Sequence, residues 1–191
     1  MDPVTLAIRF IPRSAPLPAL LLLASGACAH APQRTPEAAT TTAAGPSPVF
    51  AYWHAWTDAN GVSHMAKCRI TEFNLKSMSM PADPQWQARQ PRVEAQVLFT
   101  VQPAGWRGAW HENPKVQWII PLAGTWFVEA MDGSRVEMGP GEVSLGEDLN
   151  TKEDARGHRG HLSGNVGSGS VTLMIVQLAE EPTLNRPCRF R

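Results

Sequence analysis

Short runs of alternating apolar and polar residues, separated by glycine and proline, dominate the chain after residue 49. The clearest run is residues 93–101, in which every second side chain is apolar: Val93, Ala95, Val97, Phe99 and Val101. Residues 171–178 form a nearly continuous apolar run, as in a strand buried on both faces. No segment in this part has the periodicity of a long helix, so the pattern predicts an all-β domain.

Turn residues divide the rest of this region into further short strands. The sequence Asp58-Ala59-Asn60-Gly61 predicts a turn within residues 49–73. Asp132-Gly133 predicts a hairpin between strands over residues 125–130 and 135–138, and a third strand is expected at 142–145. The proline-bearing residues 76–92 and the polar, glycine-rich residues 146–170 predict irregular segments.

The residues before 49 predict an export signal followed by a linker. Residues 1–28 contain two arginines, an apolar run with four consecutive leucines and a stretch of small residues, which is typical of a signal peptide. Cys28 stands where a bacterial lipobox places its lipidated cysteine, but Ser25 replaces the usual leucine, so ordinary cleavage after Ala29 or Ala31 is an equal alternative. Residues 29–48 lack large apolar side chains and predict a flexible linker, which leaves 49–191 as the folded domain.

These features predict an exported protein, periplasmic or anchored to the cell envelope by a lipid on Cys28. The formal net charge of +0 gives no basis for binding nucleic acid or an anionic membrane, so we expect a small-molecule ligand. Export would place Cys68 and Cys188 in an oxidising compartment, where they could form a disulfide. The alternative is that both are reduced, buried thiols.

The candidate chemistry lies in residues 105–124. His111, Asn113 and Gln117 share odd parity, so they would point to the same face of a regular strand. A strand of a barrel presents several ligands to one interior point in this way. Farther along the chain, the irregular segment carries Glu147, Asp148, His158 and His161.

The spacing of Gly105, His111, Gln117 and Gly124 resembles the first motif of the cupin superfamily. Asn113 and Gln117 stand where that motif usually has histidine and glutamate. Gly141 resembles the opening of the second motif, and His161 with Asn165 resembles its close, although the central Pro-x-Gly is absent. The likeness is to small single-domain bacterial cupins and covers residues 93–178. It implies a single cupin barrel of the jelly-roll-like type and a homodimer.

The cupin resemblance also implies a divalent transition metal, which could be iron, manganese, zinc, nickel or copper. Its ligands would be His111, Gln117 and either His158 or His161. The two later histidines are three residues apart and lie on opposite faces of a regular strand, so both would bind only if the segment bends. The Gly-His context favours His158, and the distance to Asn165 favours His161.

Three functions remain open at this point. The first is a metal-dependent enzyme acting on a small molecule, with Glu147 or Asp148 as the proton-transfer group. These two carboxylates diverge if they lie in a strand, so they do not form an acid and base pair. The second is a small-molecule-binding protein without catalysis, in which the same residues line a polar pocket. The third is a structural barrel filled by its own side chains.

Overall fold

The computed structural model describes residues 45–191 and contains no helix there. The expected signal peptide, the lipidation of Cys28 and nearly all of the linker lie outside the described residues. None of the described segments is a helix long and apolar enough to cross a membrane.

The expectation of an all-β domain is confirmed. The strands are β1 (Phe50–Thr57), β2 (Ser63–Ile70), β3 (Asn74–Lys76), β4 (Gln85–Gln87), β5 (Ala95–Gln102), β6 (Gln117–Ala123), β7 (Thr125–Ala130), β8 (Arg135–Met138), β9 (Ser144–Glu147), β10 (His161–Val166) and β11 (Val171–Leu178).

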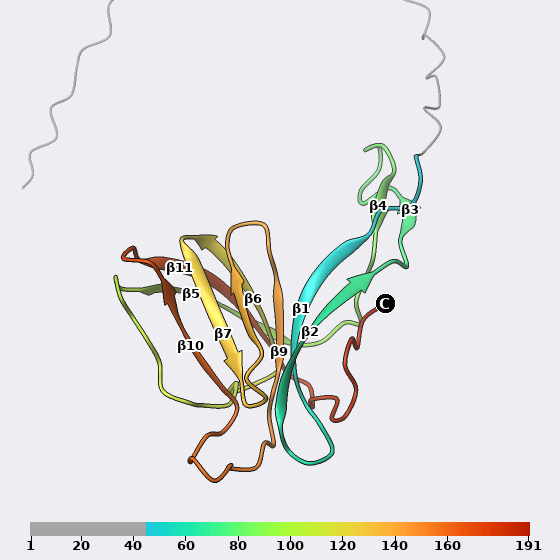
Figure 1. Cartoon of the computed structure of the whole chain (residues 1–191). Helices are drawn as coiled ribbons and strands as arrows, with labels where there is room; N and C mark the ends of the chain where they lie inside the picture. The colour runs from blue at the N-terminus through green and yellow to red at the C-terminus, as the bar shows by residue number, and fades with distance from the viewer. Residues whose placement is uncertain (1–44) are drawn as a thin grey trace, which may run out of the picture. The chain divides into compact units, whose positions relative to one another are not determined.

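Two sheets face each other (Figure 1). The larger has six strands in the order β2-β1-β9-β6-β11-β5, and the smaller has three in the order β10-β7-β8. Hydrogen bonding does not close them into a continuous barrel. A third, two-stranded sheet of β3 and β4 extends as an arm beyond one end of β1 and β2 (Figure 1). The arrangement is therefore a sandwich with an arm.

The main core lies between the two sheets. Alternation along each strand directs every second side chain inward, and the inward side chains are mostly large and apolar. Each removes apolar area from water, at about 25 cal/mol per Å². The buried members of this cluster are Ile119, Trp126, Val128, Val136, Met138, Val171 and Leu173.

A second apolar cluster covers part of the outer face of the six-stranded sheet. Tyr52 and Leu145 point outward from β1 and β9, and the C-terminal tail packs over them with Phe190. A disulfide between Cys68 and Cys188 fixes this tail to β2, which is the first of the two alternatives that the sequence left open. The core of this protein thus has two layers, one between the sheets and one beneath the tail.

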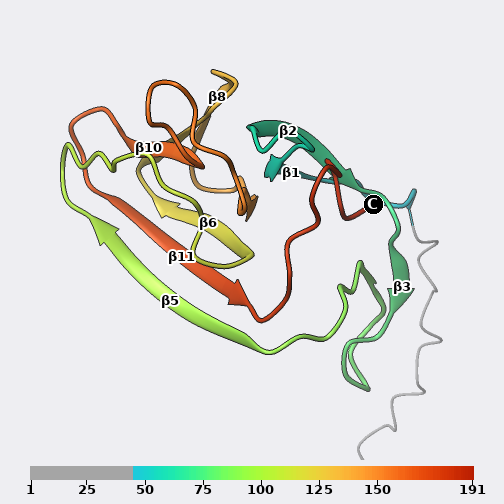
Figure 2. The same cartoon turned by 90° about the horizontal axis from the view of Figure 1, so that it is seen from below.

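The strand predicted from the clearest alternation is confirmed as β5, but its apolar face is not buried. Val97, Phe99 and Val101 are exposed, because β5 is an edge strand and nothing within residues 45–191 covers its outer side (Figure 2). Its other face looks toward the interior, where Gln102 is buried. Alternation identifies a strand but does not say which face meets a neighbour.

Two strands depart from the sequence-based expectation near the candidate site. The region predicted to be irregular contains β10, which begins at His161 and pairs antiparallel with β7. In contrast, β6 begins only at Gln117, and His111 lies in an isolated antiparallel bridge with His161. The His111 backbone N–H donates to the His161 carbonyl at 2.9 Å, and the His161 backbone N–H donates to the His111 carbonyl at 2.8 Å. This bridge brings two distant segments together.

Candidate functional site

The imidazole rings of His111 and His161 lie side by side with their centroids 4.5 Å apart. Gly160 permits this approach. Its φ is +65°, a conformation that favours glycine, and a Cβ atom there would lie 2.1 Å from the His111 carbonyl oxygen. His161 is only 3% exposed, whereas His111 remains exposed to solvent. One ring of the pair therefore lies in the packed interior, and the other lies at the surface.

On both rings the Nδ1 atom makes the hydrogen bond. Nδ1 of His161 lies 2.6 Å from Oδ2 of Asp148, and Nδ1 of His111 lies 2.7 Å from the carbonyl oxygen of Ala109. A carbonyl or carboxylate oxygen accepts, so Nδ1 carries the proton in each ring. Neither Nε2 atom has a hydrogen-bond partner within residues 45–191. In its neutral form, each ring thus presents an unshared electron pair at Nε2.

A line of buried amides holds Asp148 in place. The Asn113 side-chain amide donates to Oδ1 of Asp148, and the Gln117 amide donates to Oδ1 of Asn113 at 2.5 Å. Gln177 on β11 then donates to the Gln117 carbonyl oxygen at 3.0 Å. Asn113, Gln117 and Asp148 are all buried. Both carboxylate oxygens of Asp148 are therefore occupied, one by an amide and one by an imidazole.

Gly146 leaves room for this line of side chains. A Cβ atom at that position would lie 2.4–2.8 Å from the side-chain amide atoms of Asn113. The interior beside His161 is otherwise closely packed and leaves no room for a water molecule. It is lined by Ala55, Ile119, Trp126, Val128 and Ser144 as well as by members of the site.

The surroundings of His111 keep its ring neutral. Partial loss of hydration is the largest influence and lowers its pKa, and the neighbouring His161 lowers it further. The Ala109 carbonyl and Asp148 act in the opposite direction without reversing the shift. At neutral pH the ring is therefore neutral, with its lone pair available.

His158 lies apart from this pair. Its ring stacks on Trp110, with centroids 4.1 Å apart and planes 10° from parallel. Its backbone N–H donates to Asp154, which also accepts from the Arg156 backbone and thereby shapes the turn. The structure brings together His111, Gln117, Asp148 and His161, whereas the His158 ring packs against Trp110 and has no hydrogen bond to any of them.

Glu147 also lies apart from the pair, in a separate network beneath the C-terminal tail. It is completely buried and accepts hydrogen bonds from His54 at 2.8 Å and Arg189 at 2.8 Å, and from the hydroxyl and backbone of Thr183. The Cys188 backbone N–H donates to Nδ1 of His54, which leaves the His54 proton on Nε2, facing Glu147. Burial alone would raise the Glu147 pKa, but these hydrogen bonds and His54 outweigh it, so the pKa lies below the ordinary value.

Several members of the site could not be singled out from the sequence. Gln177 lies within an apolar run, and its polarity in that run is the signal that the sequence offers. Gly146 and Gly160 lie in a segment with many glycines, so neither stood out. Ala109 takes part through its backbone carbonyl, which no side-chain pattern could reveal.

No protein-family model matches this chain, and no curated protein matches it. Among solved structures, the crystal structure of protein NMB1881 from Neisseria meningitidis is similar over 49% of this chain and 87% of its own length. The identity is 13% and the TM-score is 0.32. A likeness this weak supports no conclusion about function.

Proposed function

We propose that this protein is an enzyme that acts on a small molecule through proton transfer at Nε2 of His161. The observation that carries the proposal is the buried hydrogen bond of 2.6 Å between Asp148 and Nδ1 of His161. A carboxylate held in this way fixes the tautomer and the orientation of an imidazole, as a general base requires. The neighbouring His111 offers a second imidazole, whose ring centre lies 4.5 Å from that of His161.

In this reaction class His161 accepts a proton from the substrate or from an attacking water molecule. The proton bonds to Nε2, and the resulting imidazolium is stabilised by Asp148 on its opposite edge. Asn113 keeps the carboxylate aligned, since it donates to the second oxygen of Asp148. His111 would accept a hydrogen bond from the substrate through its Nε2 lone pair, and its exposure provides access.

We further propose that the sandwich is a cupin whose two sheets are the halves of an opened barrel. The support is the position of the site, since His111 and Gln117 come from the first motif-like segment and His161 from the second. We also propose that the protein is exported to an oxidising compartment. Its support is the Cys68–Cys188 disulfide, a bond that persists in such compartments.

A divalent transition metal held by His111 and His161 is a second candidate. The favouring observation is that both rings donate Nδ1–H to an oxygen, the arrangement usual behind metal-bound histidines. The two imidazoles fit iron, manganese, nickel, copper or zinc as a partial set. Within residues 45–191 no three histidine, cysteine or carboxylate side chains converge, and the Gln117 amide is engaged on both sides. A bound ion would polarise a substrate oxygen as a Lewis acid.

Hydrolysis of 4-nitrophenyl acetate tests the reactivity of His161 without knowledge of the natural substrate. By one route the Nε2 lone pair attacks the acetyl carbon and 4-nitrophenolate leaves, after which water hydrolyses the acetylated ring and releases acetate. By the other route Nε2 removes a proton from a water molecule as that water attacks the acetyl carbon, and acetate and 4-nitrophenolate are formed. We expect His161→Gln to lower the rate by about tenfold or more. His158→Gln is the matched control, since it removes a histidine from the same loop, and it should keep the wild-type rate. Equal rates in wild type and His161→Gln would refute the proposal.

Metal content separates the two candidates. The purified protein would be analysed for its elements, and Co²⁺ would be titrated while its visible absorption is recorded. If the metal candidate holds, His111→Ala abolishes the Co²⁺ spectrum and His158→Ala retains it. A protein that contains no metal and gives no Co²⁺ spectrum, yet hydrolyses the ester through His161, supports proton transfer alone. If the protein neither binds a metal nor hydrolyses the ester through His161, both candidates fail. A cupin with a binding or structural role would then remain as the proposal.

A further inference from the structure

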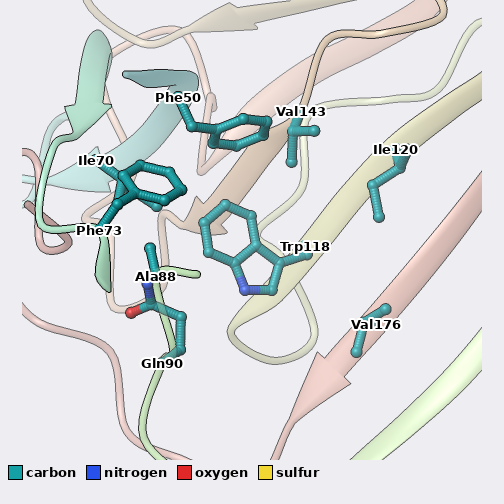
Figure 3. Close-up of a pocket in the computed structure, with 9 residues that line it drawn as sticks. All are labelled: Phe50, Ile70, Phe73, Ala88, Gln90, Trp118, Ile120, Val143 and Val176. Carbon is teal, nitrogen blue, oxygen red and sulfur yellow. The ribbon is translucent and has the colours of Figure 1, made fainter. Parts of the chain in front are cut away.

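An apolar pocket of about 360 Å³ lies on the outer face of the six-stranded sheet, whereas His161 borders the interior (Figure 3). On β6, Ile119 packs in the main core, and the alternate residues Trp118 and Ile120 point to the other face and line this pocket. Its volume is within the range of about 300–1,000 Å³ that is usual for small-molecule sites. Of its 9 lining residues, Gln90 alone is polar, so the pocket favours a hydrocarbon group.

Contacts with the C-terminal tail hold one wall of the apolar pocket in place. The Trp118 indole stacks on Phe190, with centroids 5.6 Å apart and planes 22° from parallel. The disulfide between Cys68 and Cys188 fixes the tail close to Phe190 in the sequence. Across the pocket from Trp118, the Phe50 ring remains 40% exposed (Figure 3). A wall that is formed before a ligand arrives loses little conformational entropy on binding.

A second cavity, of about 300 Å³, adjoins the apolar pocket and is rich in arginine. The two cavities share Ala88 and Gln90 in their linings, so this segment after β4 forms their common border. We call the second one the arginine cavity. Its arginines come from the segment after β4 and from the tail, and they are Arg89, Arg189 and Arg191.

Two of these arginines are available to a ligand. Arg189 is already paired with two carboxylates, at 2.8 and 2.7 Å. Arg89 and Arg191 are exposed and form no ion pair within residues 45–191. Glu72 is the one acidic side chain in the lining, so it offsets part of their charge. A guanidinium presents N–H donors in a fork that matches a carboxylate, so the arginine cavity favours an anionic group.

We propose that the apolar pocket and the arginine cavity together bind a fatty acid. The hydrocarbon chain lies against Phe50 and Trp118, and the carboxylate accepts hydrogen bonds from Arg89 and Arg191. A protein segment fits the apolar pocket less well, because its backbone polar groups would find Gln90 alone as a polar partner there. This site is separate from the proposed catalytic site, so neither proposal depends on the other.

Isothermal titration calorimetry of the full-length chain tests the hydrocarbon contact, with octanoate, decanoate and dodecanoate below their micelle concentrations. We expect affinity to rise about fourfold for each added methylene group. Ala88→Trp fills the apolar pocket and should weaken dodecanoate binding by at least about tenfold. Ala82→Trp is the matched control, since it adds the same ring at an exposed position of the arm that lines neither cavity. His161→Gln should also keep the wild-type affinity.

Circular dichroism checks that both tryptophan variants keep the wild-type fold. If the wild type does not bind dodecanoate, or if the two folded variants bind it equally well, the proposal is overturned. Association with phosphatidylglycerol vesicles in the absence of dodecanoate binding also overturns it, because the ligand would then be a bilayer and not a free fatty acid.

The carboxylate contact is tested by a change of charge on each partner. Arg89→Gln should weaken dodecanoate binding by about two- to fivefold, since an exposed ion pair contributes modestly. Arg92→Gln removes a charge from the same segment at a residue that lines neither cavity, and it should keep the wild-type affinity. Dodecyltrimethylammonium should bind the wild type more weakly than dodecanoate. Equal or tighter binding of this cation would overturn the assignment of an anionic ligand.

Discussion

The carboxylates of Glu147 and Asp148 are consecutive in the sequence yet share no hydrogen-bond partner. Glu147 binds His54, Thr183 and Arg189 beneath the tail. Asp148 binds Asn113 and His161 on the opposite side of the sheet. Side chains alternate across a strand, so one backbone position separates a network that stabilises the tail from one that orients the candidate base. Substitutions at the two positions should therefore have different effects.

Asp148→Asn should change the tautomer of His161. The new amide has one oxygen where the carboxylate had two, and Asn113 and His161 both need an acceptor. When the amide N–H₂ faces His161, Nδ1 must accept and the proton moves to Nε2, which removes the base. We expect ¹⁵N NMR of the histidine rings to show protonated Nε2 and ester hydrolysis to fall to the level of His161→Gln. Glu147→Gln should leave the His161 signals unchanged.

Glu147→Gln should lower stability rather than reactivity. The substitution leaves the buried His54 and the Arg189 guanidinium facing a neutral amide, although Arg189 keeps its contact with Glu180 at 2.7 Å. Loss of one partner from a buried pair costs about 3 kcal/mol or more of the free energy of unfolding. Urea unfolding at neutral pH measures this loss. Unchanged stability would mean that the tail does not depend on the pair.

The same carboxylate predicts a pH dependence of stability. The folded-state pKa of Glu147 lies below its ordinary value of 4.5. The folded protein therefore binds this proton less readily than the unfolded chain, and stability falls as pH decreases from the ordinary value through the folded-state pKa. We expect wild-type unfolding free energy to decline over this acidic range. The decline should be smaller in Glu147→Gln, which has no proton to bind there.

The sequence predicted the strands better than it predicted their surroundings. The strand expected at 171–178 matches β11, because alternation and apolar content are properties of the local sequence. The exposure of the apolar face of β5 could not be foreseen, since burial depends on which strands lie beside it. His111, Asn113 and Gln117 were expected on one face, and the two amides do bond to each other.

The choice between His158 and His161 depended on contacts that the sequence does not reveal. His161 begins β10 and pairs with His111, whereas His158 lies in a turn shaped by Asp154. Thr151 also holds this loop, since its hydroxyl accepts from the Gly160 N–H and donates to Glu112. The partners come from distant segments, so local spacing alone left both histidines as candidates.

Removal of the disulfide should loosen the tail. Cys68 and Cys188 are separated by 120 positions, so the bond closes a long loop. Cys68→Ser with Cys188→Ser should lower the free energy of unfolding by about 2–5 kcal/mol. Thermal unfolding with and without reductant measures the effect, and reductant should change the wild type but not the double variant. If the wild type unfolds at the same temperature with the disulfide intact and with it completely reduced, this prediction is wrong.

Gly160→Ala should separate the two histidines, and Gly157 provides a matched control. Both glycines have positive φ, +65° and +78°, so alanine is strained at each, by about 1–2 kcal/mol. A Cβ atom at Gly157 meets nothing within 4 Å, but at Gly160 it would overlap the His111 carbonyl. We expect Gly157→Ala to lose stability only, whereas Gly160→Ala also loses ester hydrolysis and the cross-peaks between the His111 and His161 rings. Full hydrolysis in Gly160→Ala would show that the paired arrangement is not needed for reactivity.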